Sequence, residues 1–363
     1  MPVAGDCKSF RPAEFEGRHA QQLMRPFTVP IAEWFQRHAR IAVVTRRKHG
    51  AVHRPAHRRK SSCTSPPLCT GNFGHFALRT VAALTLCMLT TRPDGVQVKH
   101  LSATRALMPL LMEKRSESTV FFEQTLDVTD TQRFVDAYNA QHPEDRITVF
   151  HVFMWAVGRA LHERPRLNRF TSGGRIWQRK GVHLSFAAKK KKLDDAAALV
   201  TIKREVPQHA CIADVARLLN ADIRTGRSSR QRPEDREVAL ATRLPVFATK
   251  LALKLMRWAD AWNLLPASTL AHDPLYTSMF VANLGSVGLE AAYHHLYEWG
   301  NCPFFAALGK TREEHGRLKV LVRYSFDERI DDGLSCAHSL QLVKDYVEAP
   351  LRHDSGSLHL RVA

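Results

Sequence analysis

One acidic segment of the chain combines residue types and spacing that suit catalysis. It reads F-D-E-R-I-D-D-G over residues 326–333, after a strand-like run and before a helical pattern that opens at Gly333. Glu328 and Asp332 are four residues apart across this turn, which can bring both carboxylates to the rim of a sheet, where functional residues are often held. A carboxylate there can act as a general base. An acidic turn before a helix is, however, more often a capping arrangement.

Other common catalytic patterns do not occur or have the wrong spacing. The chain has no G-x-G-x-x-G, Walker A or G-x-S-x-G sequence, and G-S-V-G at residues 285–288 does not match a nucleophile elbow. His294 and His295 precede Cys302, but adjacent histidines rarely reach one metal ion, and no carboxylate stands at ligand spacing. We therefore expect no metal site, and interpret the two histidines as part of a polar loop that lines a cleft.

Helices and strands mix irregularly from about residue 92 onward. Apolar residues at helical spacing predict helices, and alternating or continuous apolar runs predict strands. Strands are expected at 119–128, 175–178, 181–188, 198–205, 279–283, 304–310 and 319–326, and helices at 102–114, 130–141, 148–162, 212–225, 244–265 and 333–347. Because these elements follow no regular βαβ rhythm, we expect an α+β fold with a mixed sheet.

Two segments each allow two interpretations. The helix expected at 244–265 is amphipathic, which suits a substrate-access or membrane-contact element, but a helix packed in the core or between subunits is commoner and is the one we expect. Four lysines at 189–192, followed by two aspartates, could clamp a phosphate. A solvated hairpin turn is the interpretation that we favour for them.

Positive charge is concentrated at the front of the chain. Residues 1–92 hold fifteen Lys and Arg against four Asp and Glu, which is +11 of the net charge of +18. Such a segment could contact nucleic acid or anionic lipid. Its breaker-rich composition instead favours a disordered extension, or sequence read through from a misassigned start with Met88 as the true one. We expect residues 1–92 to be this extension, 93–350 to be the folded domain and 351–363 to be a flexible tail, with no specific nucleic-acid partner.

The overall composition excludes several classes of protein. Apolar residues make up 44% and charged residues 24% of the 363 residues, as in a globular protein rather than a fibrous or wholly disordered one. The longest mostly apolar run, residues 81–89, is about half the length of a spanning helix, so we expect no membrane span. Seven scattered cysteines without C-x-x-C spacing argue against a disulfide framework and indicate a cytoplasmic protein.

The acidic segment resembles the D-H-R-x-x-D-G motif of the 2-oxoacid dehydrogenase acyltransferase catalytic domain, a relative of chloramphenicol acetyltransferase. Four further segments are similar to patterns of this family, in the same order. They are 108–118 (an opening helix with its R-x-x-S end), 160–168 (A-L-x-x-x-P-x-L-N), 280–288 (T-I-S-N-L-G-x-x-G) and 301–309 (N-x-P-x-x-x-x-L-G). The resemblance implies that residues 93–350 form an acyltransferase-like catalytic domain, a chloramphenicol-acetyltransferase-like sandwich in which helices cover a mixed sheet.

The resemblance also implies a homotrimer with an active-site channel at each subunit interface. Coenzyme A and dihydrolipoamide would enter from opposite ends, and no cofactor would be bound covalently. The family's histidine takes a proton from the substrate thiol, the thiolate attacks an acyl thioester, and a hydroxyl or amide near the Asn-Leu-Gly turn stabilises the oxyanion. Asn283 stands at that turn as the donor. The residues expected to bind substrate are Arg115, Gly285, Ser286, Arg329 and Gly333.

The main departure from the family is Glu328, which stands where the catalytic histidine is expected. A free glutamate has a pKa about 4 units below that of a thiol, which opposes proton transfer by roughly 5.5 kcal/mol, about twice the mismatch that histidine faces. A carboxylate buried beside Asp332 would narrow this gap, and His294 or His295 is an alternative base. Arg115 is the candidate for the arginine that pairs with Asp332.

Residues 1–92 resemble neither a lipoyl domain nor a subunit-binding domain. We therefore expect a stand-alone acyltransferase that takes its acyl group from a free thioester such as acyl-CoA, or from a lipoyl domain on another chain. The alternative is a catalytically silent member that forms a trimeric acyl-CoA-binding or scaffold protein. A third hypothesis, a nucleic-acid or membrane-surface protein driven by the basic front, has less support.

Overall fold

The computed structural model describes residues 91–189, 199–227 and 244–354. All of these belong to one of the two units of the chain, Gly71–Ala363. Residues 1–90 of the extension predicted at 1–92, and residues 190–192 of the lysine run, lie outside the described residues, so both interpretations stay predictions.

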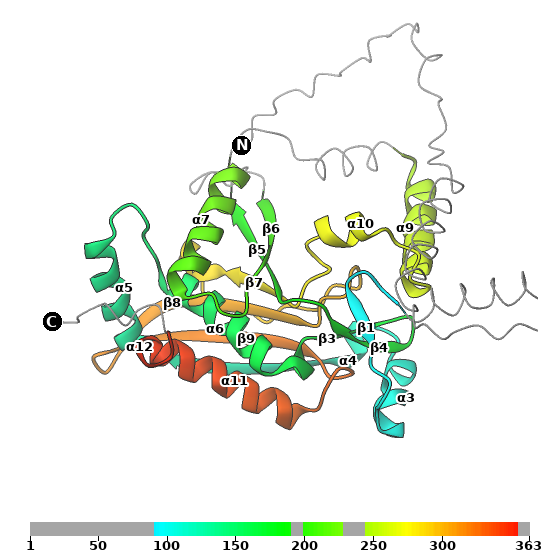
Figure 1. The fold of residues 1–363 in the computed structure, drawn as a ribbon, viewed down its shortest axis with the longest axis horizontal. Coiled ribbons are helices and arrows are strands. Elements are labelled where there is room, and N and C mark those ends of the chain that lie inside the picture. Colours follow the sequence, from blue (N-terminus) through cyan, green and yellow to red (C-terminus); the bar gives the residue numbers. More distant parts are fainter. Residues whose placement is uncertain (1–90, 190–198, 228–243, 355–363) are drawn as a thin grey trace, which may run out of the picture. The chain divides into compact units, whose positions relative to one another are not determined.

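A six-stranded mixed sheet forms the centre of the fold (Figure 1). In spatial order its strands are β2 (Thr119–Asp127), β9 (Arg317–Asp327), β8 (Phe304–Glu314), β7 (Met279–Asn283), β5 (His183–Lys189) and β6 (Leu199–Glu205). β7 runs parallel to both of its neighbours, and the other adjacent strands are antiparallel. The predicted α+β class with a mixed sheet is therefore confirmed.

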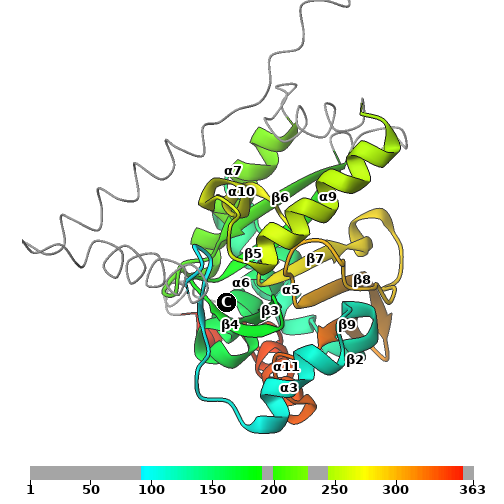
Figure 2. The same cartoon turned by 90° about the vertical axis from the view of Figure 1, so that its right-hand side faces the viewer.

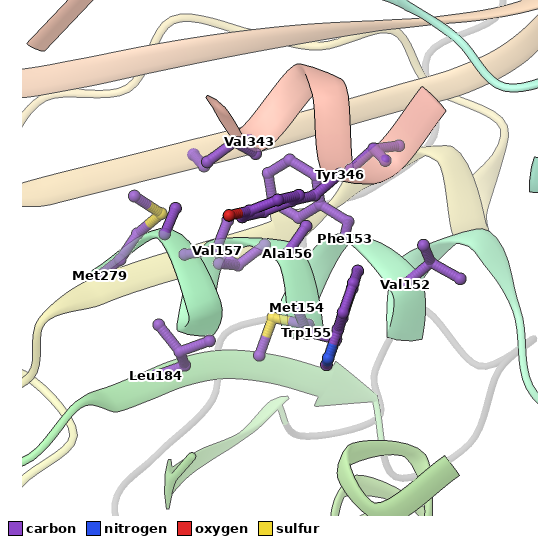
Figure 3. Packing of buried hydrophobic residues seen from close by; sticks show 14 of the residues in the cluster. Val152, Phe153, Met154, Trp155, Ala156, Val157, Leu184, Met279, Val343 and Tyr346 are labelled. Atoms are coloured by element: carbon purple, nitrogen blue, oxygen red, sulfur yellow. The ribbon is translucent and has the colours of Figure 1, made fainter. Parts of the chain in front are cut away.

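Helices cover one face of this sheet and bury the main core. They are α5 (Thr129–Gln141), α6 (Val149–Glu163), α7 (Ile212–Arg227) and α11 (Gly333–Glu348). Apolar side chains run nearly all round α6, so this helix has to be buried on several sides. Figure 3 shows them packed between Val343 and Tyr346 of α11 on one side and Leu184 and Met279 of the sheet on the other.

The opposite face of the sheet is covered by the segment 288–303, which is not helical. A second and smaller apolar cluster joins this segment to β7 and β8. Its buried members are Phe280, Leu296, Cys302, Phe305 and Ala307. Because the segment crosses this face, it also carries His294 and His295 there.

A separate three-stranded sheet has the order β1-β4-β3. Its strands are β1 (Gly95–Gln97), β4 (Arg175–Arg179) and β3 (Arg169–Ser172). The other helices are α3 (Ala103–Leu111), α4 (Arg115–Ser118), α9 (Val246–Ala261), α10 (Ala267–His272) and α12 (Pro350–His353). Both views place α3 and α9 on the same side of this unit (Figures 1 and 2), and residues of both line one cavity of about 240 Å³.

The folded domain begins before residue 93 and ends after residue 350, so both predicted boundaries are too narrow. Arg92 belongs to the fold and not to the extension, because it is buried and pairs with Asp94 (2.9 Å) and Asp260 (2.8 Å). The chain is also ordered past residue 350, where α12 is followed by the buried Asp354. The carboxylate of Asp354 accepts a hydrogen bond from the N–H of Ile212 (3.4 Å). Residues 351–354 therefore belong to the fold and not to the predicted flexible tail.

Two predicted elements differ in extent or burial. β8 and β9 continue beyond the expected ends at 310 and 319, to Glu314 and from Arg317. The helix expected at 244–265 is shorter, and no residue of α9 is buried. A place for α9 in the core of this chain is therefore wrong, while a subunit contact stays a prediction.

Candidate active site

Glu328 comes directly after the last residue of β9, at the rim of the sheet. Both of its main-chain polar groups are bonded: the N–H donates to the carbonyl of Ser118 (3.0 Å), and the carbonyl accepts from the guanidinium of Arg105 (2.6 Å). Its carboxylate is half-buried and has no hydrogen-bond or ion-pair partner among the described residues. The backbone of Glu328 is thus held by two hydrogen bonds, while its carboxylate is bound by no other described residue.

Asp332 caps the N-terminus of α11. Its carboxylate accepts a hydrogen bond from the N–H of Ser335 (2.8 Å), which is the main reason that the pKa of Asp332 is lowered. The neighbouring Asp331 is buried and accepts from Arg166 (2.6 Å) and from the hydroxyl of Ser335 (2.8 Å). Arg166 also approaches Asp332, at 3.8 Å. The capping interpretation of the acidic turn is therefore confirmed, and Arg166 is the arginine that accompanies it.

Asp327 and Arg329 form a buried ion pair on either side of the candidate base. The guanidinium of Arg329 donates to both carboxylate oxygens of Asp327 (2.8 and 2.7 Å). It also donates to the carbonyls of Met112 (2.9 Å) and Glu113 (3.1 Å), and the hydroxyl of Ser118 donates to Asp327 (3.0 Å). These bonds tie residues 112–118 to the motif. They give Arg329 an internal role, and its contact with substrate stays a prediction.

Arg115 is buried but does not form the predicted pair with Asp332. Its guanidinium donates to the carbonyls of Tyr297 (3.1 Å), Glu298 (3.3 Å) and Gly300 (2.8 Å). Burial lowers the pKa of Arg115, and its Nε has no hydrogen-bond partner in the described part of the chain. Arg115 therefore holds residues 297–300 against α4, because three carbonyl groups there point at its side chain.

The turn after β7 forms the second half of the predicted site. Oδ1 of Asn283 accepts a hydrogen bond from the N–H of Ser286 (3.2 Å), and the hydroxyl of Ser286 donates to the carbonyl of Asn283 (2.7 Å). The amide Nδ2 of Asn283 has no partner among the described residues and remains a donor. Asn283, Gly285 and Ser286 line a cavity of about 290 Å³. Ala282 stands at the serine of the family pattern, so Asn283 supplies the free side-chain donor of this turn.

The two halves of the site lie at opposite ends of the sheet. Asn283 pairs with Leu308 of β8, and Leu308 pairs with Val322 of β9. Glu328 is six residues further along the chain from Val322, or about 20 Å at the rise of a β-strand. Glu328 and Asn283 of one chain therefore cannot act on the same reacting atoms.

His294 and His295 lie nearer the Glu328 end. The ring of His294 stacks on those of Phe305 (3.9 Å between centroids) and His295 (4.5 Å). The carbonyl of His294 accepts from the hydroxyl of Ser325, which precedes Glu328 by three residues, or about 10 Å of strand. Burial lowers the pKa of His294, so its ring is neutral near pH 7. The polar loop predicted here covers the second face of the sheet.

The sequence analysis did not identify two arginines that contact the motif. Arg105 of α3 bonds the carbonyl of Glu328 from 223 residues away, and Arg166 bonds Asp331 from 165 residues away. Arg166 occupies an unspecified position of the A-L-x-x-x-P-x-L-N segment. No local pattern marks either arginine, because the contacts arise only when distant elements pack.

The described part of the chain shows no set of ligands for a metal ion. No group of three His, Cys, Asp or Glu side chains there is placed to hold one. None of the described helices has the length and apolar character needed to cross a bilayer.

Comparison with known proteins points to one family. The model of the 2-oxoacid dehydrogenases acyltransferase (catalytic domain) matches residues 94–237. No curated protein matches the chain. Among solved structures, the chain is similar to a probable dihydrolipoamide acetyltransferase from Listeria monocytogenes, with 17% identity, a TM-score of 0.47 and coverage of 73% of this chain and 98% of that one. The chain is also similar to a dihydrolipoamide acetyltransferase from Azotobacter vinelandii, with 16% identity, a TM-score of 0.46 and coverage of 71% of this chain and 94% of that one. Its similarity to a chloramphenicol acetyltransferase has 15% identity, a TM-score of 0.44 and coverage of 70% of this chain and 98% of that one.

The matched range contains two of the segments on which the resemblance was based, 108–118 and 160–168. The Asn-Leu-Gly turn and the acidic motif follow it along the chain. Residues 94–237 match the model of the catalytic domain of the 2-oxoacid dehydrogenase acyltransferases, which confirms the resemblance predicted from the motifs.

Proposed function

We propose that the protein transfers an acyl group between a thioester and a thiol at a site shared by two copies of the chain. The observation that carries the proposal is the placement of Glu328 and Asn283 at opposite ends of one sheet. Each keeps a polar group without a partner among the described residues. A copy that sets its Asn283 end against the Glu328 end of the next completes a site, and such head-to-tail contacts can close into a ring. The ring that we propose is the homotrimer expected from the resemblance.

The proposed chemistry is a thiol exchange. Glu328 takes the proton of the acceptor thiol, and the thiolate attacks the carbonyl carbon of the acyl thioester. The resulting oxyanion accepts a hydrogen bond from Nδ2 of Asn283 of the partner subunit. Collapse of this intermediate breaks the bond between the carbonyl carbon and the donor sulfur. The departing thiolate then takes the proton back from Glu328, so the base is restored.

Glutamate is a weak base for this reaction. The mismatch with a thiol is roughly 5.5 kcal/mol for free groups. A neighbouring copy that excludes water reduces it, because desolvation disfavours a charged carboxylate. We therefore expect slow turnover, and a faster reaction in Glu328→His.

Coenzyme A and acyl-CoA are the proposed substrates, with no cofactor bound covalently. A lipoyl domain on another chain is a further proposed acyl donor. The proposed location is the cytoplasm, where thiols stay reduced.

A silent trimer that binds acyl-CoA or acts as a scaffold is the second candidate. The carboxylate of Glu328 favours it, because no described residue orients this group. A catalytic base is normally held in place by a further side chain.

Release of free coenzyme A from a panel of acyl-CoAs, with dihydrolipoamide as the acceptor thiol and the purified full chain as catalyst, tests the proposal. Glu328→Gln keeps the size of the side chain and removes its basicity, so release should fall by about 10²–10⁴. Calorimetric binding of coenzyme A should stay close to that of the wild type. Asn283→Ala should lower release by about 10² or more. Glu313→Gln, on the exposed part of β8, is the matched control and should change neither quantity.

Three results would contradict this assignment in different ways. Coenzyme A binding without thiol release in the wild type would select the silent protein. Release that survives Glu328→Gln but is lost in His294→Ala or His295→Ala would move the base to the segment 288–303. A monomer in light scattering at micromolar concentration would remove the shared site.

A further inference from the structure

Helix α9 carries a stripe of large apolar side chains that the described part of the chain leaves uncovered. The stripe consists of Phe247, Leu251, Leu255, Trp258 and, at the C-cap, Trp262. Their spacing of three or four residues places them on one face of the helix. Their exposed fractions are 75, 56, 57, 57 and 46%, in the same order. An apolar face of this size has no partner among residues 91–189, 199–227 and 244–354, since no residue of α9 is buried.

The opposite side of α9 is the side attached to the fold. Asp260 pairs with Arg92 (2.8 Å) and accepts a hydrogen bond from the hydroxyl of Ser172 (2.9 Å). At 3.6 residues per turn, Asp260 lies about 180° round the helix from Leu251. The stripe therefore points away from the attachment. Figure 2 shows α9 in the foreground of the unit.

Basic residues follow one border of the stripe. Lys250, Lys254 and Arg257 project between the stripe and the attached side, about 20–80° before Phe247 on the helical wheel. None of the three has an acidic partner in the described part of the chain. Asp260, the one acidic residue of α9, is engaged with Arg92. The outward surface of the helix is thus apolar and positive.

We propose that α9 lies in the plane of an anionic phospholipid surface, with its apolar stripe in the acyl boundary and its basic border at the headgroups. Phe, Leu and Trp on one face with Lys and Arg beside them is the composition of interfacial helices. Each basic group near an anionic leaflet adds attraction. Trp258 and Trp262, whose rings lie 6.1 Å apart, suit the headgroup level.

Length excludes a helix that spans the bilayer, and charge disfavours contact with a second copy of the chain. Sixteen residues of helix are about 24 Å long, which is too short to span a bilayer core. A second copy of the chain fits the surface less well, because lysine is depleted at the cores of protein interfaces and two basic borders repel each other. The proposal does not depend on acyl transfer, since it rests only on the surface of α9.

Co-sedimentation of the full chain with lipid vesicles tests the proposal. The wild type should bind vesicles of phosphatidylcholine with a quarter of phosphatidylglycerol, bind pure phosphatidylcholine much less, and lose binding as salt increases. The double variant Leu251→Ser, Trp258→Ser should bind the anionic vesicles at least tenfold less, because it removes two large apolar groups. This variant keeps every charge, so the basic residues 1–92 contribute equally to both proteins.

Leu289→Ser is the matched control, because Leu289 has the same exposure as Leu251, 56%, and lies outside α9. It should bind like the wild type. Charge reversal at Lys250, Lys254 and Arg257 together should weaken anionic binding by about a hundredfold. Equal sedimentation of the wild type and the Leu251, Trp258 variant would overturn the proposal. So would a variant that loses its oligomer in lipid-free buffer but keeps vesicle binding, since α9 would then contact another copy.

Discussion

Removal of the Asp327 carboxylate should destabilise the protein much more than removal of an exposed carboxylate in a similar ion pair. Asp327 is 1% and Arg329 4% exposed, and the pair is joined through both carboxylate oxygens. Asp327→Ala leaves the charge of Arg329 buried, with only the carbonyls of Met112 and Glu113 as acceptors. A buried pair broken from one side costs about 3–5 kcal/mol. The free energy of unfolding should fall by this amount.

Asp130 and Arg133 provide the matched control. Their ion pair has nearly the same length, 2.8 Å, but the side chains are 73% and 72% exposed. Asp130→Ala should cost less than about 1 kcal/mol, because water compensates both charges. Urea unfolding followed by circular dichroism measures both variants. Asp327→Leu combined with Arg329→Met should recover much of the loss, since no charge then remains buried.

Two results would refute this reasoning. One is a cost for Asp327→Ala as small as that for Asp130→Ala. The other is a double variant that is no more stable than the single one, because the loss would then come from packing and not from an uncompensated charge.

Asp332→Ala should lower the free energy of unfolding by about 1 kcal/mol through loss of the helix cap. The N–H of Ser335 lowers the pKa of Asp332, so this stabilisation is present above the ordinary pKa of an aspartate and is lost as the pH falls through the lowered value. Urea unfolding of both proteins at pH 7 and near pH 2 should show the difference shrink, and a constant difference would count against the cap. Gly285→Ala should lower Tm by several degrees, because an added Cβ would lie 2.4 Å from the carbonyl oxygen of Gly309. Gly333→Ala, at the start of α11 where an added Cβ meets nothing within 4 Å, should not lower Tm and serves as its control.

The parts of the fold with strong periodicity were predicted closely. The helix expected at 148–162 is Val149–Glu163, and the strand expected at 119–128 is Thr119–Asp127. Their side chains face the core at regular intervals, so the pattern is visible in the sequence. The outer ends of β8 and β9 were missed, because residues 311–317 are exposed and show no alternation. The turn at His315 and Gly316 (φ 53° and 73°) joins these ends.

The sequence predicted which residues form the candidate site, but not which distant residues contact them. Glu328 and Asn283 could be placed at strand ends, because the apolar pattern stops beside them. Arg105 and Arg166 could not, since tertiary packing brings them across more than 150 residues of chain. The exposure of α9 could not be predicted either. An amphipathic pattern is the same whether the apolar face of the helix packs against a core, a partner or lipid.

The distance between the two ends of the sheet also determines how variants of the chain would complement one another. If each site takes Glu328 from one copy and Asn283 from the next, two forms of the chain that are each inactive can complement each other. A copy defective only at Glu328 still offers a sound Asn283 to its neighbour, and the reverse holds. A copy defective at both ends spoils the sites on either side of it, so such an allele would be dominant over a sound one.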